Sequence, residues 1–350
     1  MKKQVAVIFG GMSSEHEVSC LSVVNVVNSF DQDKYEVVLI GITKEGKWLL
    51  AESLSQIQDG SWRAGTKLAV ISPDRSRQGI YIFEKDTYEY KKVDVIFPVL
   101  HGKFGEDGTI QGLFEMSGIP YVGCGVLSSS VSMDKISTKI FVQQLGIRQA
   151  RFVADIAEDL SELEATVQKV EEQLGYPVFV KPSNAGSSVG VSKACDRAEL
   201  EKAVAEAKKY DTRVLIEEMI CGHEVECAVL GGKDAKASKI GEVVAAVEFY
   251  DYEAKYHSEE SKTIIDPENI PAAAKETVRE DAVRIFKAVS GFGLSRVDFF
   301  IEKDTNDVVF NEINTLPGFT NISMYPKLWN AMGVTTTELI DRLIGMAYER

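Results

Sequence analysis

Three side chains with oxygen donors lie near one another late in the sequence, namely Asp298, Glu312 and Asn314. Oxygen-only donors suit a hard divalent cation such as Mg2+ or Mn2+, and protein-bound Mg2+ usually shares its site with substrate phosphates. Two carboxylates that face each other in a sheet repel, so a cation between Asp298 and Glu312 accounts for the pair. The alternative is a solvated strand pair whose outer face is acidic. Arg296, in register with Asn314, favours the metal site.

The elements that would position these side chains are two strands joined by a turn. Residues 296–302 and 308–314 both alternate polar and apolar side chains, which is the period-two pattern of half-buried strands. Between them, residues 303–307 read Lys-Asp-Thr-Asn-Asp, a composition typical of a turn. An antiparallel hairpin with this turn at its centre brings Asp298 opposite Glu312.

A second stretch has the composition of an anion site, residues 183–190, which read Ser-Asn-Ala-Gly-Ser-Ser-Val-Gly. It follows a predicted strand over 177–182, in which Lys181 supplies a positive charge. Small residues let backbone N–H groups crowd around an anion, and the hydroxyls of Ser187 and Ser188 add donors. The spacing of a P-loop is absent. The composition also fits a flexible hairpin tip, but the preceding lysine favours phosphate binding.

Residues 214–220 and 224–229 form two strand-like runs with a turn between them. A hinge of this kind, with free backbone groups and an apolar lining, can hold a purine. Glu217 would then accept a hydrogen bond from the exocyclic amine, and Glu224 would accept from the ribose hydroxyls. From the residues alone we favour the plainer interpretation, which is two ordinary strands with solvent-facing glutamates.

The N-terminal part of the chain predicts an α/β domain with a doubly wound parallel sheet. A buried-type strand over 4–10 ends in two glycines, and a helix with Ser and Glu start signals follows over 13–29. Further strands are predicted over 35–43 and 93–100. Residues 46–92 have an irregular pattern that contains one short hairpin. In such sheets, ligands bind at the carboxyl ends of the strands.

The loop after the strand at 93–100 reads His101-Gly-Lys-Phe-Gly-Glu-Asp-Gly and leads into a predicted helix over 109–117. Its Gly-rich, polar composition and its place at the carboxyl end of a strand are typical of a binding loop. A lone histidine in a loop is more often a surface residue, yet His101 would lie level with Glu15 of the first helix. The residues alone leave both interpretations of His101 open.

Other regular segments are predicted from hydrophobic periodicity. The predicted helices are 127–144, 159–174, 271–291 and 335–349. Residues 121–125, Tyr-Val-Gly-Cys-Gly, have the composition of a domain junction. The polar segment 250–260 is too irregular for a core element and is typical of a functional lid.

Composition narrows the class of partner. With 350 residues, 45% of them hydrophobic and 26% charged, the chain is typical of a globular protein of two or three domains. A formal net charge of −14 argues against nucleic acid or an anionic membrane as a partner. We expect neither a signal peptide nor a membrane span, because no apolar stretch is long enough. Five scattered cysteines indicate reduced thiols and a cytoplasmic location.

Taken in order, these segments resemble the ATP-grasp ligases, and specifically the D-alanine–D-alanine ligase family. The resemblance runs nearly end to end. The motifs that carry it are Gly10-Gly11-Met12-Ser13-Ser14-Glu15, His101-Gly102 with Gly105-Glu106-Asp107-Gly108, Met133-Asp134-Lys135, Val180-Lys181-Pro182 with Gly186-Ser187-Ser188, Tyr252-Glu253-Ala254-Lys255-Tyr256, and Asn311-Glu312-Ile313-Asn314 with Pro317-Gly318. Each motif is modest evidence, whereas the ordered set is highly specific.

The resemblance implies a three-domain α/β ATP-grasp architecture, with ATP held between two α+β domains. Residues 1–123 would form a Rossmann-like substrate domain with the doubly wound parallel sheet. Residues 124–220 would form the central domain with the phosphate-binding loop, and residues 221–350 the C-terminal domain with the lid loop and the metal site. The resemblance also implies a homodimer, and it leaves a monovalent cation open as an additional cofactor.

The reaction that the resemblance implies belongs to the synthesis of peptidoglycan precursors. ATP phosphorylates the carboxylate of a first D-alanine, and the amine of a second D-alanine attacks the acylphosphate. The products are D-alanyl-D-alanine, ADP and phosphate. Such chemistry depends on charge neutralisation and positioning more than on a protein nucleophile.

By resemblance, each candidate residue takes a role in this reaction. The ATP-binding set is Lys135, Lys181, Lys255, Ser187, Ser188 and Asn311, with Glu217, Met219, Ile220 and Glu224 holding adenosine. The ligands of two Mg2+ or Mn2+ ions are Asp298, Glu312 and Asn314. The first substrate is held by a hydrogen-bonded triad of Glu15, Ser187 and Tyr256, with His101 near its carboxyl end. The tetrahedral intermediate is stabilised by Arg296 and the Gly318 N–H, and the second substrate's carboxylate contacts Ser323 and Met324.

Four alternatives accompany this interpretation. Ligases that join D-alanine to D-serine or to D-lactate share the family pattern, but Tyr256 and the apolar Met324 favour D-alanine as second substrate. Another ATP-grasp enzyme, such as a biotin carboxylase-like protein, would not explain Glu15 and the His101 loop together. A non-catalytic nucleotide-binding module would leave the metal site and the lid without a role. Glu218 stands where the family often has lysine, so no side-chain donor to adenine is expected there.

Overall fold

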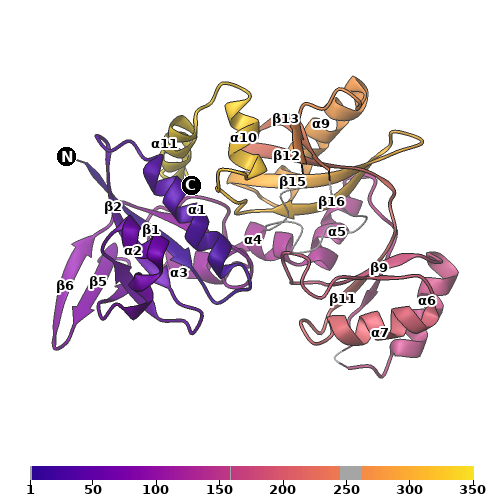
Figure 1. The fold of residues 1–350 in the computed structure, drawn as a ribbon, viewed down its shortest axis with the longest axis horizontal. Coiled ribbons are helices and arrows are strands. Elements are labelled where there is room, and N and C mark those ends of the chain that lie inside the picture. The colour runs from indigo at the N-terminus through magenta and orange to yellow at the C-terminus, as the bar shows by residue number, and fades with distance from the viewer. Residues whose placement is uncertain (1, 158, 245–261) are drawn as a thin grey trace.

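The computed structural model describes residues 2–157, 159–244 and 262–350. These residues build three β-sheets with seven, four and five strands. Figure 1 shows the seven-stranded sheet on one side of the molecule, and the five-stranded and four-stranded sheets one above the other on the opposite side. The chain visits the sheets in sequence order, so each sheet corresponds to one continuous part of the chain up to residue 314.

The first sheet is mixed, in the order β6-β5-β4-β3-β2-β1-β7. Its parallel part is confirmed for β1 (Lys3–Gly10), β2 (Tyr35–Ile42) and β7 (Val95–Leu100). All three are apolar runs buried almost throughout, as parallel strands covered on both faces require. The antiparallel strands are β3 (Trp48–Ala51), β4 (Leu68–Ile71), β5 (Gly79–Glu84) and β6 (Thr87–Lys92).

The prediction of an irregular segment over 46–92 is therefore wrong outside the β5–β6 hairpin. Two of its strands have only four residues, too few for a period-two pattern to stand out. Between them lie the short helix α2 (Leu54–Asp59) and the 3-10 helix η1 (Ser61–Ala64). The latter carries Trp62, whose ring is buried against the sheet in edge contact with Phe9.

Helices cover this sheet and bring the end of the chain back to it. α1 (His16–Asn28) and α3 (Thr109–Ser117) follow β1 and β7, as the sequence predicts. α11 (Thr336–Ala347) places its apolar side chains in the same hydrophobic cluster as β1, β2 and β7. Asp341 of α11 accepts hydrogen bonds from Lys34 Nζ (3.0 Å) and Tyr35 Oη (2.5 Å).

The predicted helix over 127–144 is two helices, α4 (Val126–Met133) and α5 (Lys135–Gln143). Asp134 interrupts them with non-helical angles, φ −83° and ψ 102°. Its carboxylate accepts from the backbone N–H of Ser137 at 2.7 Å and thereby caps α5. The apolar periodicity continues across Asp134, and an aspartate inside a helical pattern is not by itself a stop signal. The break was therefore not predicted.

The second sheet has the order β10-β9-β11-β8. Its strands are β8 (Phe152–Asp155), β9 (Val178–Pro182), β10 (Ser192–Ala194) and β11 (Val214–Glu218). The helices α6 (Leu163–Gln173) and α7 (Arg197–Ala207) bury their apolar faces against it. The loop between β9 and β10 is the predicted phosphate-binding segment, and the predicted strand before it is confirmed as β9.

The third sheet has the order β14-β13-β12-β15-β16. Its strands are β12 (Gly222–Gly231), β13 (Lys236–Val244), β14 (Lys262–Ile265), β15 (Gly293–Glu302) and β16 (Val308–Asn314). α9 (Ala272–Ala288) covers one face, and α10 (Met324–Asn330), which the sequence did not predict, follows β16. The predicted hairpin register is confirmed, with Asp298 paired to Glu312 and Arg296 to Asn314.

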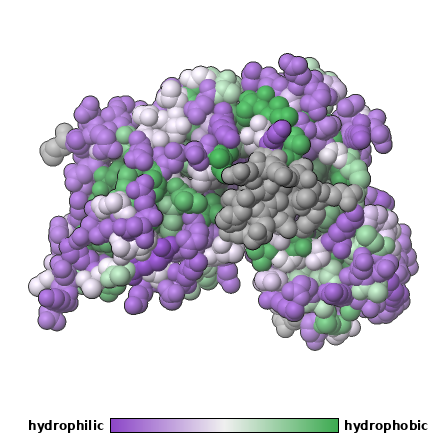
Figure 2. Space-filling view, viewed as in Figure 1, coloured by the Kyte–Doolittle hydropathy of each residue, from purple (hydrophilic) through white to green (hydrophobic). Residues whose placement is uncertain are grey.

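The surface agrees with the acidic, hydrophilic composition. Figure 2 shows hydrophilic residues over most of the visible face, interrupted by hydrophobic residues in the region of α1. Leu21 of that helix is 67% exposed. Among the described residues, no helix combines the length and the hydrophobicity needed to cross a membrane. The predicted lid, residues 250–260, lies outside the described residues.

The packing of Trp62 predicts that an added methyl group at Gly41 destabilises the first sheet. A Cβ atom at Gly41 would lie 2.3 Å from the Trp62 ring and 2.9 Å from Phe9. We expect Gly41→Ala to lower the free energy of unfolding by about 1–3 kcal/mol, the usual cost of overpacking. Thermal unfolding followed by circular dichroism measures it.

The matched control is Gly112→Ala in α3, where nothing lies within 4 Å of the added atom. This change should leave the unfolding temperature unchanged or raise it, because alanine favours a helix over glycine by roughly 0.5–1 kcal/mol. Equal effects of the two substitutions would contradict the packing argument.

Candidate active site

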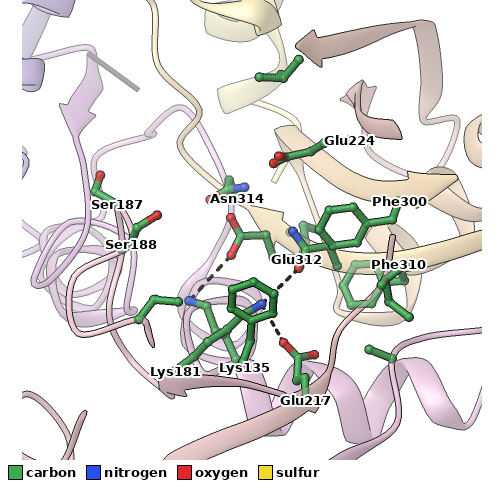
Figure 3. A pocket seen from close by; sticks show the side chains of 18 of the residues that line it. Lys135, Lys181, Ser187, Ser188, Glu217, Glu224, Phe300, Phe310, Glu312 and Asn314 are labelled. Atoms are coloured by element: carbon green, nitrogen blue, oxygen red, sulfur yellow. Dashed lines mark hydrogen bonds and ion pairs between the residues drawn. The ribbon is translucent and has the colours of Figure 1, made fainter. Parts of the chain in front are cut away.

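A cavity of about 660 Å3 opens between the second and third sheets. Side chains of β9, β11, β12, β15 and β16 line it (Figure 3). The β9–β10 loop and Glu15, the residue that precedes α1, line it as well. Phe179, Phe300 and Phe310 give it an apolar part, and several charged groups converge on the remainder. Its volume and its mixed lining are typical of sites for small molecules and cofactors.

Two lysines supply positive charge to the cavity of this acidic protein. Lys181 of β9 lies 2.6 Å from Glu217 Oε2 and 3.5 Å from Asn311 Oδ1. Lys135, the first residue of α5, donates to the carbonyl of Ala185 at 2.7 Å and lies 3.7 Å from Glu312 Oε2 (Figure 3). Burial lowers the pKa of Lys181, but the charge and hydrogen bond of Glu217, together with the charges of Glu312 and Glu224, outweigh it, so that this pKa lies above its ordinary value.

The β15–β16 hairpin presents the oxygen donors that the sequence singled out. Glu312 and Asn314 line the cavity. Asp298 is buried beside them and accepts two hydrogen bonds from the guanidinium of Arg296, at 2.8 and 2.7 Å. Asn314 Nδ2 donates to the same carboxylate at 3.0 Å, and Arg296 also lies 3.1 Å from Glu226. This donor set fits a hard divalent cation, with Glu312 and Asn314 facing the space a nucleotide would fill.

Glu15 meets the phosphate-binding loop on the far side of the cavity. Ser187 Oγ donates to Glu15 Oε1 at 2.6 Å. A Cβ atom at Gly186 would lie 2.6 Å from the other carboxylate oxygen, and one at Gly102 would lie 2.5 Å from it. Two loops distant in sequence therefore close around one carboxylate, and their glycines leave room for it. Ser187 and Ser188 adopt left-handed backbone angles, φ 50° and 58°.

His101 is buried, so its interpretation as a surface residue is wrong. Its Nδ1 lies 3.0 Å from the carbonyl oxygen of Leu316, and its Nε2 lies 3.5 Å from Ser22 Oγ. Burial lowers the pKa of His101, which keeps the imidazole neutral at neutral pH. A carbonyl can only accept, so Nδ1 carries the proton of the neutral ring.

Glu106 also binds Leu316, which lies in the loop after β16, although the sequence analysis assigned Glu106 no role. Its Oε1 accepts from the Leu316 N–H at 3.0 Å and its Oε2 accepts from the Gly102 N–H at 2.8 Å. His101 and Glu106 together thus satisfy both backbone groups of Leu316. Burial raises the pKa of Glu106, and the nearby charge of Glu15 raises it further, to about 8.

The adenosine candidates lie at the opposite end of the cavity. Glu217 of β11 is 4% exposed, so the expectation that it faces solvent is wrong. Met219 and Ile220, in the link to β12, and Glu224, on β12, line the cavity. Glu218 also lines the cavity, and its carboxylate accepts a hydrogen bond from Arg151 Nε at 2.6 Å.

Residues 4–124 match the family model described as the D-ala D-ala ligase N-terminus, and residues 141–345 match the D-ala D-ala ligase C-terminus. The chain belongs to the D-alanine–D-alanine ligase family. It is 51% identical to the D-alanine–D-alanine ligase of Acetivibrio thermocellus and 48% identical to that of Caldicellulosiruptor bescii. Each alignment covers 100% of this chain and 96% of the relative.

Solved structures of the family have the same fold. The VanG D-Ala:D-Ser ligase from Enterococcus faecalis matches with a TM-score of 0.89 and 40% identity, over 99% of this chain and all of that chain. The D-alanine–D-alanine ligase from Coxiella burnetii matches with 0.84 and 34%, over 100% and 96%. The ligase from Bacillus anthracis complexed with ATP matches with 0.71 and 27%, over 99% and 98%. The predicted ATP-grasp fold class is thereby confirmed.

Other candidate residues of the ligase lie apart from the cavity lining. Ser323 Oγ accepts from the Thr320 N–H at 3.0 Å and lies 2.7 Å from Thr320 Oγ1. Gly318 lies beside Ser323, since a Cβ atom there would be 2.8 Å from the hydroxyl oxygen. Met324 begins α10 and is buried in the hydrophobic cluster shared with the first sheet. The described part of the chain does not include Lys255 and Tyr256.

Two charged residues of the site were missed, Glu106 and Lys139. Glu106 belongs to the Gly-Glu-Asp-Gly run that supported the family resemblance, so a signal existed. Lys139 lies four residues after Lys135 on α5 and its ammonium group is 2.5 Å from Glu217 Oε1. Four-residue spacing places both lysines on one side of the helix. The sequence shows this spacing, but it does not show that Glu217 lies beside Lys139.

The pKa of Glu106 predicts a change of stability with pH. Between its ordinary value of 4.5 and about 8, the folded protein holds a proton that the unfolded chain has released. The contribution of this group to the free energy of unfolding therefore falls as the pH rises through that range. Glu106→Gln removes the contribution, so the variant should gain stability relative to the parent at higher pH. Urea unfolding at several pH values measures it.

Glu89→Gln on the exposed strand β6 is the control, and its stability relative to the parent should not vary with pH in this way. A Glu106→Gln difference that stays constant from about pH 5 to 8 would show that Glu106 titrates at its ordinary pKa in the folded protein.

Proposed function

We propose that this protein ligates two D-alanine molecules to D-alanyl-D-alanine, with ATP converted to ADP and phosphate through an acylphosphate. The observation that carries the proposal is the convergence of Lys135, Lys181 and the Glu312–Asn314 edge on one cavity, in a chain that matches the family over its whole length. Phosphoryl transfer of this kind requires positioned cations around a triphosphate more than a protein nucleophile.

ATP fits the cavity with its base towards β11 and its phosphates towards the β9–β10 loop. The lysines support the phosphate end, because an anion on a protein of net charge −14 needs local positive groups. The apolar side chains Phe179, Phe300 and Phe310 support the purine end. Glu217 and Glu224 would accept hydrogen bonds from the base and the ribose, and Ser187 and Ser188 would donate to phosphate.

A divalent cation, Mg2+ or Mn2+, would be held by Asp298, Glu312 and Asn314. When bound, it neutralises charge on the phosphates. The donor set supports this assignment because it contains only oxygens and because two carboxylates share one end of the hairpin. Arg296 holds Asp298 through two hydrogen bonds and so fixes the direction of its carboxylate. A second ion and a monovalent cation remain expectations from the family resemblance.

The first D-alanine would bind where Glu15 and Ser187 meet. A carboxylate with a hydroxyl bound to it suits the ammonium group of an amino acid. The neutral His101, held by Leu316, would lie near the carboxyl end of this substrate, and Arg296 with the Gly318 N–H would stabilise negative charge in the transition state. Tyr256 would complete the triad with Glu15 and Ser187, while Lys255 would add a charge to the phosphates.

For the second substrate we propose D-alanine. The curated relatives with about half of their residues identical are D-alanine–D-alanine ligases, which supports this choice. The specific alternative is D-serine, because the VanG D-Ala:D-Ser ligase resembles this chain with a TM-score of 0.89. Contact of Ser323 with the substrate carboxylate would be common to both, whereas the apolar side chain of Met324 favours D-alanine.

The three sheets support domains at 1–123, 124–220 and 221–350, with two exceptions. α11 packs on the first sheet, and Val131 of α4 and Val142 of α5 belong to the hydrophobic cluster of the third sheet. The proposals of a homodimer and of a cytoplasmic location rest on the family resemblance. Light scattering of the purified protein tests the homodimer.

The function predicts phosphate release that requires both D-alanine and Mg-ATP. The assay measures inorganic phosphate with D-alanine alone, then with D-alanine paired with D-serine or with D-lactate, and identifies the dipeptide by mass spectrometry. D-alanine alone should support full turnover. Release without D-alanine, or only with a mixed pair, would contradict the proposed reaction.

Glu312→Gln tests the metal assignment. The amide keeps the shape of the side chain but removes the charge that a divalent cation requires, so turnover should fall by at least about a hundredfold. The unfolding temperature should stay close to that of the parent, since Glu312 lies at the cavity. Asp304→Asn in the exposed turn of the same hairpin is the control and should retain activity. Near-normal turnover of Glu312→Gln would remove the assignment.

A further inference from the structure

Lys139 is a buried lysine that no step of the proposed reaction uses. Only 1% of its surface is exposed, and it does not line the cavity. Its ammonium group lies 2.5 Å from Glu217 Oε1 and 3.4 Å from the carbonyl of Ala150, and it sits over the ring of Phe152. Burying an ammonium group is costly unless it is paired. Burial lowers the pKa of Lys139, and the charge and hydrogen bond of Glu217 oppose this effect.

Glu217 is held between two lysines from different elements. Lys139 reaches Oε1 from α5, and Lys181 reaches Oε2 from β9 at 2.6 Å. Burial opposes ionisation of Glu217, but the two ammonium groups outweigh it and hold its pKa at about 2. The carboxylate is therefore ionised, and the cluster of three side chains carries a net charge of +1.

The two lysines differ in what else they can reach. Lys181 lines the cavity and has 17% of its side-chain surface exposed, whereas the side chain of Lys139 is 2% exposed and lies behind Glu217. On its cavity side, Lys181 Nζ lies 3.5 Å from Oδ1 of Asn311, the residue that precedes Glu312 in the sequence. An anion that enters the cavity thus meets Lys181 and not Lys139.

We propose that Lys139 is a positioning residue for ATP, which neutralises Glu217 from behind and so leaves Lys181 able to pair with the triphosphate. Without Lys139, Lys181 becomes the sole counterion of a buried carboxylate, and moving it towards a phosphate leaves that carboxylate unpaired. With Lys139 in place, the carboxylate keeps a partner while Lys181 turns to the nucleotide. This inference rests on the proposed function only in that the cavity binds ATP.

Lys139→Met tests the proposal, because methionine keeps most of the length of the side chain without its charge. Isothermal titration of the full chain measures the Kd for ATP and, separately, for adenosine. The Kd for ATP should rise about tenfold or more, the usual effect of losing a charge-assisted hydrogen bond, and that for adenosine should change little. A purely structural role of Lys139 would weaken both ligands alike.

A double substitution keeps the test sharp if Lys139→Met unfolds the protein. Lys139→Met combined with Glu217→Gln removes both charges, so no carboxylate is left unpaired. It should bind ATP as Glu217→Gln alone does, because Lys139 acts through Glu217. The thermal unfolding of all variants is recorded beside the titrations.

Two results would overturn the proposal, namely equal losses for ATP and adenosine in Lys139→Met, or a further loss of ATP affinity in the double variant. The ligase function is judged separately by phosphate release that depends on D-alanine. A parent protein that binds ATP but releases no phosphate with D-alanine contradicts the ligase function alone. A parent protein that does not bind ATP overturns both.

Discussion

The structure depends on opposite charges paired out of contact with water around one cavity. Glu217 is held between two lysines and Asp298 by a guanidinium, and each carboxylate is almost fully buried. A buried charge without a partner costs several kcal/mol, so these pairs form together with the sheets that carry them. The result is a local excess of positive charge at the lysines, inside a protein whose overall charge is −14.

Contacts between distant loops keep the cavity in one shape. Leu316 follows the strand that bears Glu312, yet its N–H and carbonyl are both bound by side chains of the loop after β7. Glu15 is likewise held by Ser187 of the phosphate-binding loop. The loop after β7 and the loop after β16 are therefore linked through the backbone of Leu316. A shift of one sheet relative to another would break several of these bonds at once.

Local sequence patterns were enough to predict the structure where a side chain's position follows from its own strand or helix. In the hairpin of β15 and β16, the period-two alternation predicted both strands, and Asp298 pairs with Glu312 as expected. The register shifts between Asp298 and Phe299, so the turn alone does not set this pairing. The phosphate-binding loop, the helix over 109–117 and the parallel strands follow from equally local signals. Local reasoning failed at Asp134, whose capping bond breaks a helix, and over 46–92, where four-residue strands are stabilised only by their neighbours in the sheet.

The sequence by itself determined the fold family, the acidic hairpin and several of the residues that line the cavity, since ordered motifs and strand periodicity are properties of the chain. Only the tertiary structure decided that His101 is buried, that Glu106 binds Leu316 and that Lys139 lies behind Glu217. Those contacts join residues from different elements, tens to hundreds of positions apart. Their geometry follows from how the sheets pack, which periodicity does not encode.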